Sequence, residues 1–115
     1  MPPLLPNYLR TLRMRWGMSQ RELATLLGIS ESALSLCETQ VRPPTVNLVI
    51  GAEVIFGQSA REAFPAIYAQ TERNVLRRAA AFSKRLEHDS DDTVKMKQRL
   101  LTEMIARSEV DNKHL

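Results

Sequence analysis

The sequence predicts an all-α protein, and three observations lead to this prediction. With 43% hydrophobic and 25% charged residues, the chain of 115 residues has the balance of a folded domain rather than a disordered one. Only four Gly, three Phe, two Tyr and one Trp are present, which favours helices over short aromatic strands. Apolar residues also recur at helical spacing between caps and prolines. The length suits one domain, or a small domain with an extension.

The first expected helix spans about residues 7–16. It follows a proline-rich start and places Leu9, Leu12 and Trp16 at helical spacing. Gly17 is a suitable residue to end it. Arginines between the apolar positions make this helix amphipathic.

Two short helices should follow closely. Ser19 and Glu22 form a capping box, because each side chain can accept from the other residue's free backbone N–H. The helix that begins there runs to Gly28, and Ser30 caps the next one, over about 31–38. Two helices joined by such a short turn containing Gly suggest a helix-turn-helix.

A fourth and a fifth helix complete the N-terminal part. Thr45 is expected to cap the fourth helix, which stops at Gly57. Ser59 and Glu62 form a second capping box and open a short fifth helix, which Pro65 interrupts.

The character of the chain changes after Pro65. A long amphipathic helix is expected over 66 to about 88, and a last helix should begin after Asp91, Asp92 and Thr93. The long helix has Tyr68, Val75, Ala79, Phe82 and Leu86 along one side. We therefore expect a first domain over 1–65 and a C-terminal helical extension over 66–115.

Composition and charge exclude several classes of function. The net charge of +3 permits a nucleic-acid partner without requiring one. No segment resembles a signal peptide or a membrane-spanning helix, so we expect a cytoplasmic protein without a membrane partner. The single cysteine, Cys37, lies on the apolar side of its helix, so we expect a small core residue there, with a nucleophile as the alternative. No metal-ligand spacing or phosphate loop occurs, so neither enzymatic activity nor a cofactor is expected.

The helix-turn-helix spacing is accompanied by a wider residue pattern within 7–64. The matching positions are Leu12, Arg13, Gly17, Met18, Ser19, Gln20, Glu22, Leu23, Ala24, Leu27, Gly28, Ile29, Ser30, Leu34, Ser35, Glu38 and Pro43. This region resembles the Cro/repressor-type (XRE-like) helix-turn-helix family. The resemblance implies a five-helix DNA-binding domain whose third helix enters the major groove.

The resemblance also implies which residues meet DNA. Four positions on the third helix should point at base edges, namely Glu31, Ser32, Ser35 and Leu36. Four other residues should contact the DNA backbone, namely Ser19, Gln20, Arg21 and Arg42. For Gln20, a solvated polar side chain beside a cap is the alternative. None of the base-facing residues is Arg, Lys, Asn or Gln, so specificity should be modest or partly shape-derived.

Two further expectations concern the end of the third helix. The resemblance implies an internal ion pair between Arg13 and Glu38, with two solvated charges as the alternative. Family members often have Gly where Gln40 stands here, in a turn with positive φ. We therefore expect an altered turn, which puts the position of Arg42 on the DNA backbone in doubt.

The sequence as a whole indicates a sequence-specific DNA-binding transcriptional regulator, a repressor that binds a palindromic operator in double-stranded DNA as a homodimer. Residues 66–115 are expected to dimerise, with folding back onto the same chain as the alternative. The rival function is a protein-interaction adaptor or antitoxin-like module, which would bind an unidentified protein partner while DNA contact is vestigial.

Overall fold

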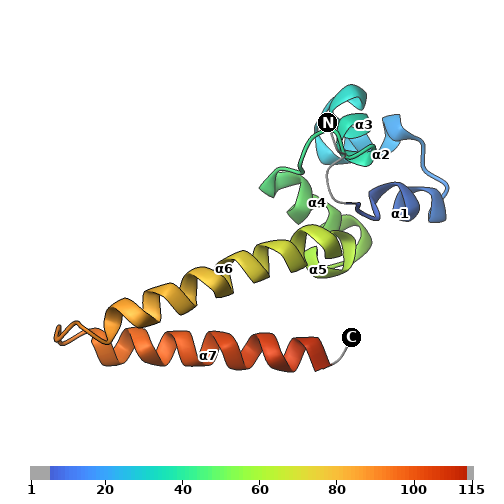
Figure 1. The fold of residues 1–115 in the computed structure, drawn as a ribbon. Coiled ribbons are helices and arrows are strands. Elements are labelled where there is room, and N and C mark those ends of the chain that lie inside the picture. Colours follow the sequence, from blue (N-terminus) through green and yellow to red (C-terminus); the bar gives the residue numbers. More distant parts are fainter. Residues whose placement is uncertain (1–5, 114–115) are drawn as a thin grey trace. The chain divides into compact units, whose positions relative to one another are not determined.

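The computed structural model describes residues 6–113, with side chains for 6–110. All seven elements in this part of the chain are α-helices, and no strand occurs there, which confirms the expected all-α fold (Figure 1). The helices are α1 Leu9–Arg15, α2 Gln20–Leu27, α3 Glu31–Glu38, α4 Val46–Phe56, α5 Ala60–Ala63, α6 Pro65–Leu86 and α7 Val94–Lys113. The chain forms two compact units, Met1–Ala69 and Gln70–Leu115.

Side-chain caps start four of these helices. The oxygens of Ser19, Ser30, Thr45 and Ser59 each accept from a backbone N–H in the first turn of the helix that follows. At Ser19 and Ser59 the capping box is complete in both directions. Local sequence thus sets these helix starts, because each cap satisfies backbone groups that the helix leaves open.

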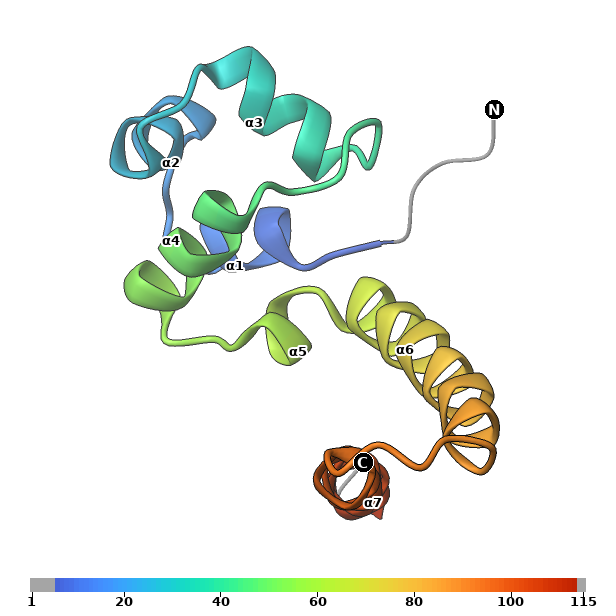
Figure 2. The same ribbon diagram turned by 90° about the vertical axis from the view of Figure 1, so that its left-hand side faces the viewer.

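The core of the N-terminal unit joins its first three helices. Its largest fully buried side chains are Leu9 from α1, Leu23 from α2 and Leu34 from α3. Figure 2 shows α1 and α4 below the α2–α3 pair. Ile67 also packs against this core, so the compact unit extends beyond residue 65, the expected boundary, to Ala69.

The helices α2 and α4 approach closely at Gly51. A Cβ atom on Gly51 would lie 2.6 Å from Cδ2 of Leu27. Such a distance is too short for two carbons, so a side chain at position 51 would force the end of the Leu27 side chain to move.

The turn after α3 differs from the expectation. Gln40 adopts φ of 64°, the one positive φ of a non-glycine residue in the described chain. The positive-φ turn is therefore kept, with glutamine in a conformation that glycine adopts more readily. The expectation of an altered turn was wrong, because the carbonyl of Leu36 accepts from the backbone N–H groups of Val41 and Arg42, which holds the chain in this shape.

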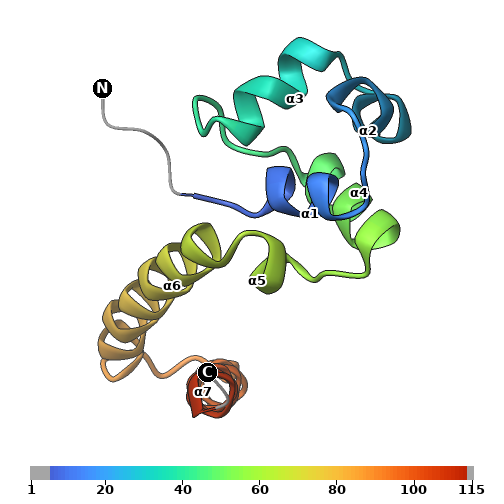
Figure 3. The same ribbon diagram turned by 90° about the vertical axis from the view of Figure 1, so that its right-hand side faces the viewer.

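The C-terminal unit is a helical hairpin of α6, from Gln70 on, and α7 (Figures 1 and 3). In the loop between them, the carboxylate of Asp91 accepts from the backbone N–H of Thr93 at 2.9 Å, and α7 begins at the next residue. Ala79 and Leu86 of α6 are buried. A groove of about 580 Å³ remains between the two helices.

Candidate nucleic-acid interface

The starts of α2 and α3 lie next to each other on the surface. The guanidinium Nε of Arg21 donates to Oε1 of Glu31 at 2.7 Å, across the two helices. This hydrogen bond raises the pKa of Arg21 further above its ordinary value. Because both side chains are exposed, water and salt screen the pair, and either partner can exchange to another ligand. The pair brings together one residue expected at the DNA backbone and one expected at base edges.

Beyond Glu31, the outward face of α3 carries no charge. Ser32 is exposed, while Ser35 and Leu36 are half-buried. Neither serine hydroxyl has a hydrogen-bond partner among the described residues. Both hydroxyls are therefore available as donors or acceptors to an external ligand.

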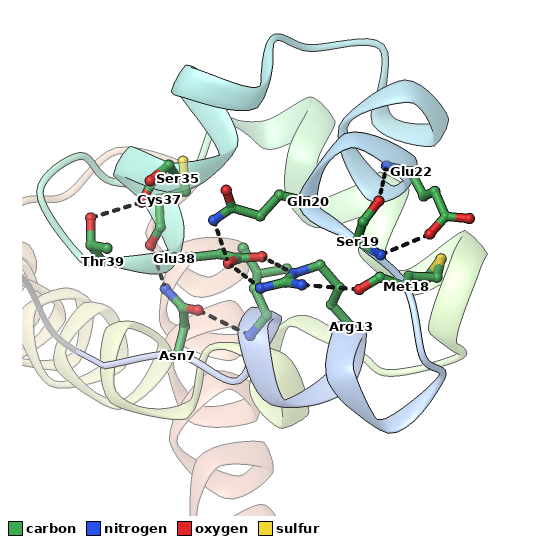
Figure 4. Close-up of polar contacts among 11 residues, drawn as sticks. Asn7, Arg13, Met18, Ser19, Gln20, Glu22, Ser35, Cys37, Glu38 and Thr39 are labelled. Carbon is green, nitrogen blue, oxygen red and sulfur yellow. Dashed lines mark hydrogen bonds and ion pairs between the residues drawn. The ribbon is translucent and has the colours of Figure 1, made fainter.

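An ion pair lies behind this face (Figure 4). Arg13 donates from Nε to Oε2 of Glu38 at 2.8 Å and from Nη2 to Oε1 at 3.0 Å. Its Nη1 donates to the carbonyl of Met18 at 2.9 Å. The hydrogen bond to Glu38 raises the pKa of Arg13. With side chains only 12% and 1% exposed, the two charges are largely removed from water, so each depends on the other.

Gln20 joins the same cluster. Its amide Nε2 donates to Oε1 of Glu38 at 3.1 Å, and the side chain is half-buried (Figure 4). One amide hydrogen of this residue is thus directed at Glu38, and the amide carries a second. This link could not be predicted from the sequence, because a contact between residues 18 positions apart leaves no local signal.

Asn7 was not among the site residues predicted from the sequence. Its Nδ2 donates to the carbonyl of Cys37 at 3.1 Å, and its Oδ1 accepts from the backbone N–H of Leu9 at 3.0 Å. Asn7 therefore ties the start of α1 to the end of α3. An asparagine just before a helix is a recognisable start signal, but its contact with α3 is not.

The remaining candidates divide into exposed and buried residues. Ser19 and Arg42 are exposed, and the hydroxyl of Ser19 accepts from the backbone N–H of Glu22 at 3.1 Å.

Cys37 is buried, and desolvation raises the pKa of its thiol, which disfavours the reactive thiolate. In the described part of the chain no group of three His, Cys, Asp or Glu could hold a metal ion. None of the helices described there is long and apolar enough to cross a membrane.

Comparison with known proteins agrees with this geometry. A family model described as a helix-turn-helix domain matches residues 5–62, a segment that contains α1 to α4 and the start of α5. No curated protein and no solved structure is similar enough to match the chain. The match is consistent with the resemblance to the XRE-like family and supports a role in binding DNA. By the extent of this match, the chain belongs to the helix-turn-helix domain family.

Proposed function

We propose that this protein is a sequence-specific transcriptional regulator of the repressor type, which acts in the cytoplasm. It would bind a palindromic operator as a homodimer, with one α3 in each of two major grooves. The observation that carries the proposal is the outward face of α3. Its serine hydroxyls have no partner among the described residues, and a buried ion pair and the core hold the helix behind them.

In this proposal the residues of α3 read base edges. The hydroxyls of Ser32 and Ser35 bond base edges, and Leu36 meets a thymine methyl. Once its ion pair with Arg21 has opened, the carboxylate of Glu31 accepts a hydrogen bond from a cytosine amino group. Because none of these side chains makes the bidentate contacts typical of Arg or Asn, specificity comes partly from DNA shape.

The backbone contacts come from the start of α2 and from the turn after α3. The open N–H groups of the first turn of α2, next to Ser19, attract a phosphate, and Gln20 offers its second amide hydrogen. Arg21 and Arg42 add positive charge. Residues 1–65 nevertheless carry only six basic against five acidic residues, so a single unit should bind weakly at physiological salt.

Dimerisation would offset this weakness, and the C-terminal hairpin is its proposed site. Small residues of α6, Ala79 and Ser83, line the groove opposite Leu101 and Ile105 of α7. Small side chains let a further helix approach closely. The hairpin of a second chain, packed on α6 and α7, would form a four-helix bundle. Two linked units then gain about a hundredfold or more in avidity without a new base contact.

Selection of bound duplexes from a random pool tests the proposal. We expect an enriched sequence made of two inverted half-sites, with centres about 34 Å apart, one turn of the duplex. On that operator, Ser32→Ala or Ser35→Ala should flatten preference at one or two base pairs with a loss of about 1–3 kcal/mol. Gln20→Ala should weaken binding to all sequences alike. Equal losses on operator and random DNA for every variant would refute these roles.

One observation favours the rival function, a protein-interaction adaptor or antitoxin-like module. Val46, Ile50 and Val54 form one exposed side of α4, with 73%, 53% and 79% of their surfaces accessible. A shift of duplex DNA measured at increasing salt separates the two functions. The regulator should show a steep loss of affinity with salt, whereas the adaptor should bind no duplex.

A further inference from the structure

One side of α6 carries all the basic residues of this helix. Their positions are offset by 4, 5, 11 and 12 from the first, and these offsets fall on one side of a helix with 3.6 residues per turn. The five residues, together called the basic face, are Arg73, Arg77, Arg78, Lys84 and Arg85, and all are exposed.

The basic face is separate from the side of α6 that packs. Ala79 and Leu86 are the buried residues of this helix, and Glu72, its one acidic residue, lies seven positions before Ala79 on that same side. The positions interspersed with the cations on the outer side include Asn74 and Ala81. Neither acid nor large apolar groups therefore interrupt the basic face.

The cations of the basic face have few partners in the protein. Arg77 donates from Nη2 to the amide oxygen of Asn74 at 3.0 Å, and the guanidinium of Arg85 lies 5.4 Å from the ring centre of Phe82. Among the described residues, Arg73, Arg78 and Lys84 form no ion pair. On α7, by contrast, Arg99 pairs with Glu103 at 3.1 Å. The basic face is thus left with uncompensated positive charge.

We propose that the basic face of α6 is a second DNA contact, which binds the phosphate backbone of a duplex without reading sequence. This inference rests on the proposed function, and charge complementarity carries it. From Arg73 to Arg85 the helix rises by about 18 Å, the length over which one DNA strand presents about five phosphates. The basic face would supply the electrostatic attraction that residues 1–65, with six basic and five acidic residues, largely lack.

A duplex suits this surface better than an anionic membrane does. A basic helix binds a membrane by inserting its apolar side among the lipids. In α6 the buried Ala79 and Leu86 lie on the side toward the groove with α7, and the positions between the cations on the outer side, Asn74 and Ala81, are polar or small. Binding to the phosphates of a DNA duplex requires no insertion of apolar side chains.

The test measures how binding of a random duplex depends on salt. The duplex has about 40 base pairs, roughly four helical turns, and the full-length chain is used. The α6 variant combines Arg73→Gln, Arg78→Gln and Lys84→Gln, which spares the two arginines with local partners. A control with the same loss of charge combines Lys95→Gln, Lys97→Gln and Arg107→Gln on α7. Helicity and sedimentation of each variant are compared with those of the wild type.

We expect the negative slope of log K against the logarithm of the salt concentration to become less steep by about 2–3 in the α6 variant. This corresponds to about 0.9 for each lost phosphate contact. The α7 control should stay near the wild-type slope. A further variant, Arg73→Lys with Arg78→Lys, keeps the charges and should keep the slope, which separates lost charge from lost folding.

Other results would overturn the inference. An α6 variant with the wild-type slope, or a control that loses as much, excludes the basic face as a DNA contact while the proposed function stands. Loss of binding to phosphatidylserine vesicles, with the DNA slope intact, would assign the face to a membrane. If the wild type binds no duplex at all, the proposed function itself fails.

Discussion

Glu38 accepts hydrogen bonds from residues of two other helices, Arg13 of α1 and Gln20 of α2. Its carboxylate is 1% exposed, so the charge depends on these donors rather than on water. The same cluster reaches the carbonyl of Met18 through Arg13. A single residue at the end of α3 therefore helps to set how α3 lies on α1 and α2, and with it the direction of the candidate base-facing side chains.

Arg13→Ala should lower the free energy of unfolding by about 3 kcal/mol, because it leaves the carboxylate of Glu38 buried without its cation. Glu38→Ala should cost a similar amount, and the double variant less than the sum of the two. Urea unfolding measures all three. The exposed Arg10→Ala on α1 is the control and should change stability by less than about 0.5 kcal/mol. Unchanged stability in both single variants would mean that the pair contributes nothing.

Gln40→Gly should stabilise the protein by about 0.5–1 kcal/mol. A left-handed backbone conformation destabilises a residue that carries a Cβ by about 1–2 kcal/mol, and glycine removes this strain. Glycine also has greater conformational freedom in the unfolded chain, which offsets part of the stabilisation. Gln40→Ala keeps the Cβ and should gain nothing. Chemical denaturation compares the three chains, and equal midpoints would show that the turn carries no strain.

At the scale of the helices, local caps and close contacts act together. Ser19 with Glu22 and Ser59 with Glu62 each satisfy the open N–H groups of a helix start. Where α2 meets α4, the end of the Leu27 side chain instead lies against Gly51, where a Cβ atom would displace it. Helix starts are therefore local features, while the spacing of the helices is not.

The capping box of α2 should make stability depend on pH. The backbone N–H of Ser19 donates to Glu22 and holds the pKa of this carboxylate below its ordinary value of 4.5. A group whose pKa is lower in the folded state stabilises it above the unfolded pKa and loses this effect as pH falls through the folded pKa. Glu22→Gln keeps an acceptor that does not titrate.

The wild type should accordingly melt at a higher temperature than Glu22→Gln near neutral pH, and the gap should close below about pH 4.5. Thermal melts over a pH series measure this gap. Glu53→Gln removes an equal charge at a position outside any helix cap. The difference in melting temperature between this variant and the wild type should not close at low pH. A gap that is constant with pH would exclude a contribution from the charged cap.

At the scale of the whole molecule, the two compact units divide the proposed work. Met1–Ala69 holds the helix-turn-helix and its core, and Gln70–Leu115 holds the hairpin with its groove and basic face. Among the residues whose side chains the structure describes, the core of the first unit includes none beyond Ile67. The first unit has its own core and should therefore fold by itself.

A chain that ends at Ala69 should stay helical and become monomeric, and its affinity for an operator should drop by about a hundredfold or more, because avidity is lost. Circular dichroism, sedimentation and DNA binding measure these three properties, with the full-length chain as reference. If the full chain sediments as a monomer at micromolar concentration and both chains bind DNA equally, residues 70–115 do not dimerise it.

Much of the fold was open to prediction because its signals are local. Caps such as Ser19 and Thr45 and the left-handed Gly28 and Gly57 mark helix ends within a few residues, and apolar spacing singles out Leu34 as core. The helix-turn-helix follows from these signals, as does the set of α3 residues that share its outer face. The length and the exposed side of α3 are thus determined by the sequence itself.

Contacts between distant residues were decided only by the tertiary structure. The amide of Gln20 reaches Glu38, Asn7 ties α1 to α3, and Gln40 keeps a turn that its side chain disfavours. The physical reason is that hydrogen bonds and packing across many residues of sequence depend on how whole helices meet, whereas caps and helical periodicity depend on neighbours within one or two turns.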